Sequence, residues 1–176
     1  EFRRGQAVVD IGGSFTTLPI AMARRVRVNG LVDVIDLDAE AVEKGEKATL
    51  PILLDMRDVN WIRYKQGDAR GLPYLVDSFD RVVCVSTLEH VEGGPEARFK
   101  AVSEMMRVLK PGGLLLLTFD IRMDGSKDGA FLDRAEASAI LTMLGIDPMA
   151  PAKQPTTVGF VDDIQVAVMM IRWEKS

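Results

Sequence analysis

The chain has 176 residues, of which 47% are hydrophobic, and this suits one domain with a single buried core. Its formal net charge is −4, so the composition gives no electrostatic reason to expect a nucleic-acid partner. The single cysteine, Cys84, excludes an intrachain disulfide and is typical of a reducing compartment, so we expect a cytoplasmic protein. No apolar run approaches the ~20 residues that a membrane-spanning helix needs.

The chain alternates short apolar runs with longer amphipathic segments. Expected strands cover residues 7–10, 31–36, 62–66, 79–85, 114–119 and 164–173. Expected helices cover residues 18–26, 39–48, 95–109 and 132–144. Pro51 interrupts the second helical pattern and leaves residues 50–60 unassigned, while residues 120–130 are expected to form a loop. Strands that alternate with helices predict a doubly wound α/β sheet of mostly parallel strands, with a ligand site beyond their carboxyl ends.

Two strand ends carry residues that suit a nucleoside. Residues 7–13 read Ala-Val-Val-Asp-Ile-Gly-Gly, so an apolar strand runs into Gly12 and Gly13, which let bare backbone approach a ligand. The next strand ends in Asp36, whose carboxylate can accept hydrogen bonds from both hydroxyls of a ribose. Asp38 is the competing acid, although it could serve only as a helix cap. The glycines alone could make a turn, but together with Asp36 they predict a nucleoside-containing cofactor.

Further motifs follow in a fixed order along the chain. The set VVDIGG, VIDLD, GDA, FDRVVCVSTLEHV and RVLKPGGLLLLTF resembles the class I S-adenosylmethionine-dependent methyltransferases over roughly residues 5–120. The resemblance implies a Rossmann-like fold, with a mostly parallel sheet of the seven-stranded type, helices on both faces and an antiparallel last strand. It also implies S-adenosylmethionine as cofactor, S-adenosylhomocysteine as product and a small-molecule methyl acceptor.

The resemblance also implies which residues contact the cofactor. They are Asp10, Gly12, Gly13, Ser14, Asp36, Leu37, Asp68, Ala69 and Ser86. In the family, the acid at the position of Asp36 holds the ribose, and the residue at the position of Leu37 packs by the adenine. The acid at the position of Asp68 accepts from the adenine amino group, and the backbone N–H of Ala69 would face the ring. Asp68 could instead be a turn residue after Gly67.

Two residues bear on the chemical step. His90 is the only histidine, and histidine is the side-chain type that titrates near neutrality, so it could act as general base for an acceptor hydroxyl. A lone histidine can equally be structural. Some relatives bind a divalent metal through a Glu-x-x-Glu-His run, but Ser86 stands in place of the first glutamate here, so we expect no metal.

The glycine loop departs from the family pattern, because Ser14 and Thr16 stand where glycines usually alternate, and their side chains could narrow the site. Only residues 1–6 precede the first strand, so we expect one methyltransferase-like domain over residues 1–176 with little or no N-terminal cover. Both features keep open a catalytically weak or inactive methyltransferase-like binding module. A nicotinamide-dependent oxidoreductase is the second alternative, although residues 12–17 lack Gly-x-Gly-x-x-Gly. The sequence specifies neither the methyl acceptor nor the oligomeric state.

Overall fold

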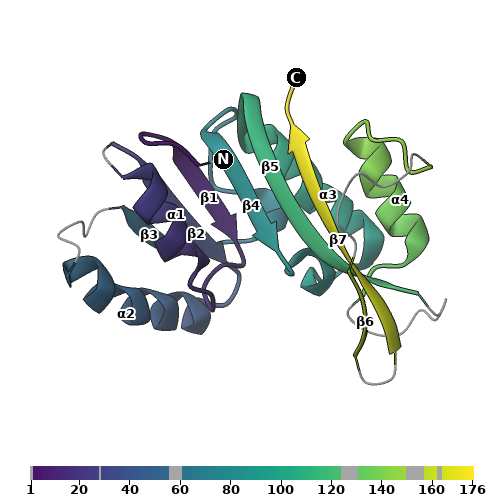
Figure 1. Ribbon diagram of the computed structural model, residues 1–176, viewed down its shortest axis with the longest axis horizontal. Coiled ribbons are helices and arrows are strands. Elements are labelled where there is room, and N and C mark those ends of the chain that lie inside the picture. Colours follow the sequence, from purple (N-terminus) through teal and green to yellow (C-terminus); the bar gives the residue numbers. More distant parts are fainter. Residues whose placement is uncertain (1, 28, 56–60, 124–130, 150–156, 162–163) are drawn as a thin grey trace.

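The computed structural model describes residues 2–27, 29–55, 61–123, 131–149, 157–161 and 164–176. Within these residues one sheet has the strand order β3-β2-β1-β4-β5-β7-β6 (Figure 1). Its strands are β1 (Ala7–Ile11), β2 (Leu31–Asp36), β3 (Ile62–Gln66), β4 (Phe79–Val85), β5 (Leu109–Arg122), β6 (Thr157–Val161) and β7 (Ile164–Glu174). The helices are α1 (Leu18–Val26), α2 (Ala39–Asp55), α3 (Gly94–Val108) and α4 (Arg134–Met143), with short 3₁₀ turns η1 (Ala69–Gly71) and η2 (Leu88–His90).

The order of the strands confirms the predicted doubly wound sheet. β1 pairs in parallel with β2 on one side and with β4 on the other. Strands β1 to β3 are therefore added toward one edge of the sheet, and β4 and β5 toward the other. The pairs β2–β3 and β4–β5 are also parallel. β7 lies antiparallel between β5 and β6, as expected for the last strand. Doubly wound sheets bind ligands at such a switch point, beyond the carboxyl ends of the strands.

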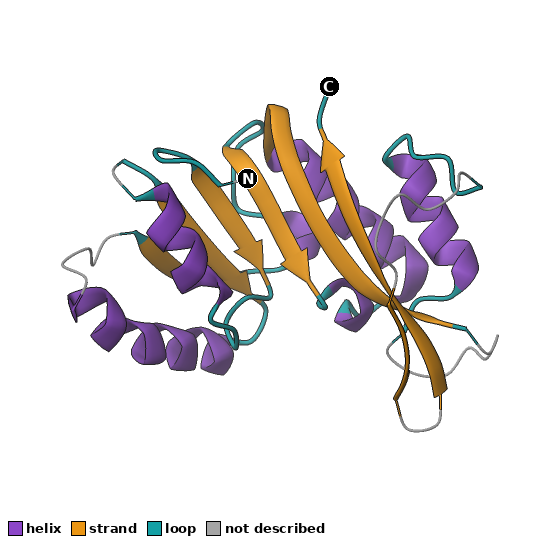
Figure 2. Ribbon diagram, in the orientation of Figure 1, coloured by secondary structure: helices purple, strands orange, loops and turns teal. Residues whose placement is uncertain are grey.

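Helices cover both faces of the sheet (Figure 2). Successive residues of β1 point to opposite faces. Val8 belongs to a hydrophobic cluster with Met22 of α1, whereas Val9 belongs to the larger cluster with Met105 of α3 and Ile140 of α4. Burial on both faces explains why this strand reads as a nearly continuous apolar run. No helix in the described part of the chain is long and apolar enough to cross a membrane.

Three elements differ from the sequence prediction. β5 begins at Leu109 instead of residue 114 and continues to Arg122, into the segment expected to be a loop, because its pairing with β4 and β7 extends beyond the apolar run. α2 continues through Pro51 to Asp55 instead of ending near residue 48. A proline inside a helix removes one N–H donor, but the helix continues on both sides of it, and in the preceding turn the Thr49 hydroxyl donates to the Gly45 carbonyl at 3.0 Å. β6 is not predicted from the sequence. Its five residues include Gly159 and show no helical or alternating pattern, and the strand is defined by its antiparallel pairing with β7.

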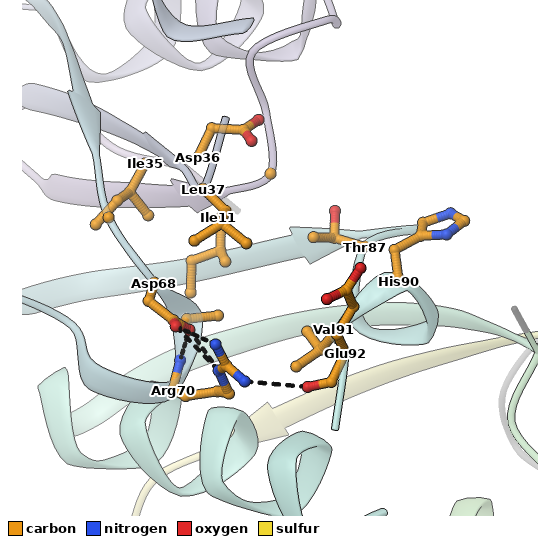
Figure 3. Close-up of a pocket in the computed structure, with 13 residues that line it drawn as sticks. Ile11, Ile35, Asp36, Leu37, Asp68, Arg70, Thr87, His90, Val91 and Glu92 are labelled. Carbon is orange, nitrogen blue, oxygen red and sulfur yellow. Dashed lines mark hydrogen bonds and ion pairs between the residues drawn. The ribbon is translucent and has the colours of Figure 1, made fainter. Parts of the chain in front are cut away.

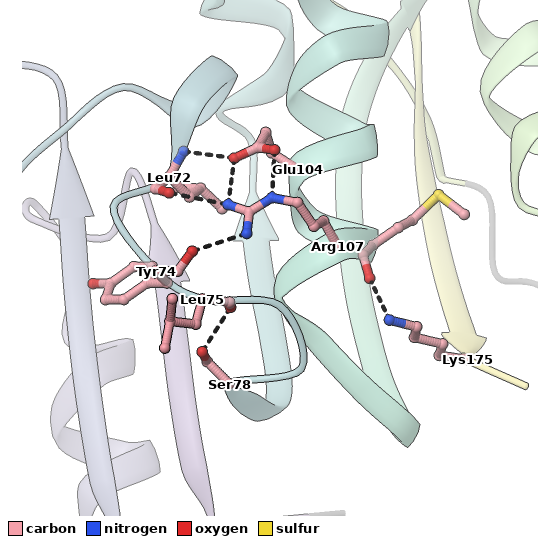
Figure 4. A network of polar contacts seen from close by, with 8 residues as sticks. Leu72, Tyr74, Leu75, Ser78, Glu104, Arg107 and Lys175 are labelled. Atoms are coloured by element: carbon pink, nitrogen blue, oxygen red, sulfur yellow. Dashed lines mark hydrogen bonds and ion pairs between the residues drawn. The ribbon is translucent and has the colours of Figure 1, made fainter.

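A polar network attaches the segment after η1 to α3 (Figure 4). The Arg107 guanidinium donates to the backbone carbonyls of Tyr74 (2.8 Å) and Leu72 (3.0 Å). Glu104, one turn earlier in α3, pairs with Arg107 at 2.6 Å and accepts from the backbone N–H of Leu72 at 2.8 Å. Because this segment leads from β3 to β4, the network fixes where the end of β3 lies relative to α3.

Replacing Arg107 with alanine is expected to lower the free energy of unfolding by about 1–3 kcal/mol, the scale of hydrogen bonds to charged groups. The carbonyls of Leu72 and Tyr74 would lose a donor, and Glu104 would lose its cationic partner. Urea denaturation of the ligand-free protein measures the change. Arg24→Ala removes an exposed arginine from α1 and, as the control, should change the free energy by less than about 0.5 kcal/mol. Equal effects of the two variants would contradict the anchoring role.

Candidate functional site

The carboxyl ends of β1, β2, β3 and β4 meet around one cavity of about 160 Å³ (Figure 3). Its lining residues come from all four strand ends and the turns that follow them: Ile11, Gly12, Ile35, Asp36, Leu37, Gly67, Asp68, Ala69, Arg70, Thr87, His90, Val91 and Glu92. The cavity lies at the switch point of the sheet, as the sequence predicts. It is smaller than the roughly 300–1,000 Å³ of sites for drug-sized ligands, so it encloses only part of a molecule as large as S-adenosylmethionine.

Gly12 and Gly13, in the loop after β1, each lie close to a different side chain. Gly12 has a φ of 77°, and a Cβ added there would lie well inside van der Waals contact of the Thr87 side chain. Its N–H donates to the Ile35 carbonyl at 2.8 Å, which joins the ends of β1 and β2. A Cβ at Gly13 would collide with the Asp10 carboxylate. Gly12 therefore lines the cavity, whereas Gly13 makes room for a buried acid beneath the loop.

The structure does not bring Ser14 or Thr16 to the cavity at the strand ends. Both line a second cavity of about 360 Å³ between the loop and α2. The Ser14 side chain is buried there, and a Cβ at Gly45 of α2 would lie 2.7 Å from the Ser14 carbonyl oxygen. α2 therefore packs closely against this part of the loop. The two side chains are thus not placed where they would narrow the cavity at the strand ends.

The two acids after β2 have separate roles. Asp36 lines the cavity, and its Oδ1 accepts from the Asp38 N–H at 3.2 Å. The Asp38 carboxylate instead accepts from the backbone N–H of Glu40 at 2.8 Å and so caps the start of α2. Leu37 lines the cavity and is exposed. The geometry favours Asp36 over Asp38 as the ligand-facing acid.

Asp68 and Ala69 both line the cavity after β3. Asp68 caps η1 by accepting from the Arg70 backbone N–H at 2.8 Å, and it forms an ion pair with the Arg70 guanidinium (Nη2–Oδ2 2.6 Å). These hydrogen bonds to Arg70 hold the pKa of Asp68 below its usual range. Arg70 is not among the residues that the sequence predicts for the site. Its only sequence signal is a basic residue two positions after an acid that closely follows a strand.

The turn after β4 places some predicted residues at the cavity and others outside it. Ser86 has a φ of 47°, is exposed and donates its N–H to the Thr118 hydroxyl at 3.0 Å, and it does not line the cavity. Thr87, which the sequence does not single out, lines it instead. His90 is exposed at the rim, with its imidazole directed away from the Asp68–Arg70 pair (Figure 3). A base at this position lies at the rim of the cavity, apart from the Asp68–Arg70 pair.

Two carboxylates lie buried near the site without lining it. The Asp10 side chain is only 1% exposed, and burial, with the nearby charge of Asp36, raises the pKa of Asp10 to about 7. Glu89 is 3% exposed, and burial, with the charge of Asp120, raises the pKa of Glu89 to about 7. Among the described residues, Asp10 Oδ2 and both Glu89 oxygens have no hydrogen-bond partner. The same residues contain no group of three or more His, Cys, Asp and Glu arranged to hold a metal ion.

The sequence matches a known family over most of this fold. The model of the methyltransferase domain family matches residues 9–117. The chain belongs to this family. Among curated relatives, the ubiquinone/menaquinone biosynthesis C-methyltransferase of Idiomarina loihiensis is 34% identical over 115 residues, which are 65% of this chain and 43% of that protein. The enzyme of the same name from Methylococcus capsulatus is 32% identical with the same coverage, so the chain spans less than half the length of these relatives.

Solved structures show the same fold. An arsenic(III) S-adenosylmethionine methyltransferase from Chlamydomonas reinhardtii aligns with a TM-score of 0.77 at 17% identity, covering 98% of this chain and 64% of that one. A SAM-dependent methyltransferase from Aquifex aeolicus aligns with a TM-score of 0.64 at 19% identity, covering 97% and 85%. The family and structure matches confirm the predicted class I S-adenosylmethionine-dependent methyltransferase family and its Rossmann-like fold. S-adenosylmethionine is accordingly the cofactor that the family implies.

Proposed function

We propose that the protein transfers a methyl group from S-adenosylmethionine to a small-molecule acceptor. The observation that carries the proposal is the convergence of Gly12, Asp36, Leu37, Asp68 and Ala69 on one cavity at the switch point of the sheet. In this proposal Asp36 accepts from the ribose hydroxyls, Asp68 and Ala69 bind the adenine, and the Gly12 backbone lies alongside the cofactor.

The residues of the chain would contribute mainly position and exclusion of water. S-adenosylmethionine, when bound, supplies a methyl group already activated by the positive charge on sulfur. The strand ends would hold that group in line with the acceptor, which is the contribution that orientation makes to catalysis. His90 would take a proton only where the acceptor is an un-ionised hydroxyl or amine.

The acceptor and the location of the protein are further parts of the proposal. The curated relatives are named as C-methyltransferases of ubiquinone/menaquinone biosynthesis, so quinone precursors are the first acceptor class to assay. A net charge of −4 argues against a nucleic-acid acceptor. The single cysteine, Cys84, is buried and unpaired, which fits a cytoplasmic protein. Family membership favours methyl transfer over the nicotinamide-dependent oxidoreductase.

Binding of S-adenosylhomocysteine is expected to raise the melting temperature, whereas NAD should not. Saturation at 100 times the dissociation constant adds roughly 2.7 kcal/mol to the free energy of unfolding. Transfer of a labelled methyl group to a panel of acceptors then separates an enzyme from a module that only binds the cofactor. The absence of any shift at millimolar S-adenosylhomocysteine would contradict the proposal, and a shift with NAD alone would favour the oxidoreductase.

Asp36→Ala is expected to weaken S-adenosylhomocysteine binding by about 1.5–3 kcal/mol, because a charged acceptor of two hydroxyl hydrogen bonds is lost. Asp38→Ala is the matched control: it should leave binding nearly unchanged but lower the free energy of unfolding by about 0.5–2 kcal/mol, since Asp38 caps α2. Calorimetric titration and urea denaturation of both variants measure the two effects. A larger loss of binding in Asp38→Ala would reverse the assignment.

A further inference from the structure

Arg70 joins two sides of the candidate site that are not neighbours in the sheet. Asp68 and Arg70 follow β3, whereas Glu92 follows β4, and both β2 and β1 lie between these strands. The Arg70 guanidinium contacts Asp68 on one side and donates to the backbone carbonyl of Glu92 at 3.1 Å on the other (Figure 3). All three residues line the cavity. The arginine therefore ties together the turns that enclose it.

The same arginine determines how the Asp68 carboxylate is held. Arg70 Nε lies 2.9 Å from both carboxylate oxygens, Nη2 lies 2.6 Å from Oδ2, and the Arg70 backbone N–H donates to Oδ1 at 2.8 Å. A planar guanidinium that contacts both oxygens fixes the orientation of a carboxylate as well as its charge. An aspartate carboxylate is ionised at neutral pH, so it can accept from an amino group but cannot donate to a keto oxygen, and Arg70 adds the fixed orientation. Such a carboxylate distinguishes a 6-amino purine from a 6-oxo purine.

We propose that Arg70 is a positioning residue for the cofactor base, which fixes Asp68 so that the site accepts a 6-amino purine and rejects a 6-oxo purine. This rests on the proposed function, in which Asp68 contacts the adenine.

The exposure of the pair indicates that its effect is on binding and not on folding. The side chains of Arg70 and Asp68 are 37% and 36% exposed, and ion pairs with this exposure contribute little to stability. The contact is also local, between residues two positions apart in one turn. Removal of Arg70 should therefore leave the fold intact and release the carboxylate.

The test compares S-adenosylhomocysteine with its 6-oxo analogue, S-inosylhomocysteine, by calorimetric titration. We expect the wild type to bind S-adenosylhomocysteine at least about 10-fold more tightly than the analogue, because loss of one hydrogen bond to a charged group has this scale. Arg70→Ala leaves Asp68 ionised but no longer holds its carboxylate in one orientation, so S-adenosylhomocysteine binding should weaken about 10-fold and the selectivity should fall toward 1. Arg70→Lys keeps the charge without the planar fork and should lie between the two. Arg25→Ala removes an exposed arginine from α1 and should change neither value.

The ratio of the two affinities decides the outcome, because damage to the fold would weaken the binding of both ligands alike. Circular dichroism and the melting temperature of the ligand-free variants report folding. If Arg70→Ala keeps the wild-type selectivity, at any affinity, or if the wild type does not distinguish the two ligands, the proposal is wrong. Should Arg70→Ala fail to fold, Arg70→Lys decides by the same ratio. A wild type that binds neither ligand would contradict the proposed function itself, and this inference with it.

Discussion

Replacing Gly12 with alanine is expected to abolish detectable S-adenosylhomocysteine binding and to lower the free energy of unfolding by roughly 2–5 kcal/mol. Gly12 has a φ of 77°, and an L-residue in the left-handed region costs about 1–2 kcal/mol. The added Cβ would also collide with the Thr87 side chain, and over-packing of this kind costs typically about 1–3 kcal/mol. Relief of the collision would move the loop or Thr87, and both line the cavity.

Gly112 provides a matched control for the cost of placing an L-residue in the left-handed backbone conformation. It has a φ of 71°, but no atom lies within 4 Å of a Cβ added there. Gly112→Ala should therefore show the strain of about 1–2 kcal/mol alone and bind S-adenosylhomocysteine like the wild type. The double variant Gly12→Ala/Thr87→Ala should regain part of the stability and part of the binding. Urea denaturation and calorimetric titration measure these values, and wild-type binding by Gly12→Ala would show that the loop does not contact the cofactor.

The sequence predicts the strands around the site well because their signal is local. β2, β3 and β4 begin and end at the predicted residues. β2 and β4 carry mainly buried apolar residues, as strands covered on both faces do. β3 lies at the edge of the sheet, and only its first residue, Ile62, is buried. The predicted end of α2 is wrong because Pro51 removes a hydrogen bond from the helix but does not end it. β6 depends on a partner strand, and pairing between strands is not visible in a five-residue run.

The side chains beyond the strand ends are harder to predict, because the backbone angles of a turn decide where each one points. At the end of β4, the positive φ of Ser86 leaves it outside the cavity, and Thr87 takes its place. Beyond the end of β1, Ser14 packs close to α2 and lines a second cavity. Arg70 enters the site only because Asp68 and Glu92 hold its guanidinium there. Residue types and spacing predicted the strand ends that build the site, whereas these contacts required the structure.

The free energy of unfolding of the ligand-free protein should contain a component that falls as the pH rises from about 4 to about 7. Burial, with the charge of Asp36, raises the pKa of Asp10 to about 7, whereas an aspartate in an unfolded chain titrates near 3.9. Between these values the folded state binds the extra proton, so stability is greatest below the unfolded pKa and decreases up to the folded pKa. Burial raises the pKa of Glu89 to about 7, so Glu89 contributes in the same direction.

The variants Asp10→Asn and Glu89→Gln isolate these two components. An amide resembles the protonated acid in shape and stays neutral, so each variant should match the wild type near pH 4 and exceed its stability at pH 8 by roughly 4 kcal/mol. Asp33 acts in the opposite direction: burial alone would raise its pKa, but ion pairs with Arg63 and Lys65 hold it below the usual range. The difference between the free energies of unfolding of variant and wild type is therefore the quantity to measure, by urea denaturation across this pH range.

Parallel curves of this free energy against pH for Asp10→Asn and the wild type would mean that Asp10 is stably ionised beneath the glycine loop. A divergence would mean that ionisation of Asp10 beneath the glycine loop is unfavourable in the ligand-free protein, and a cationic cofactor bound nearby would relieve that cost with release of a proton.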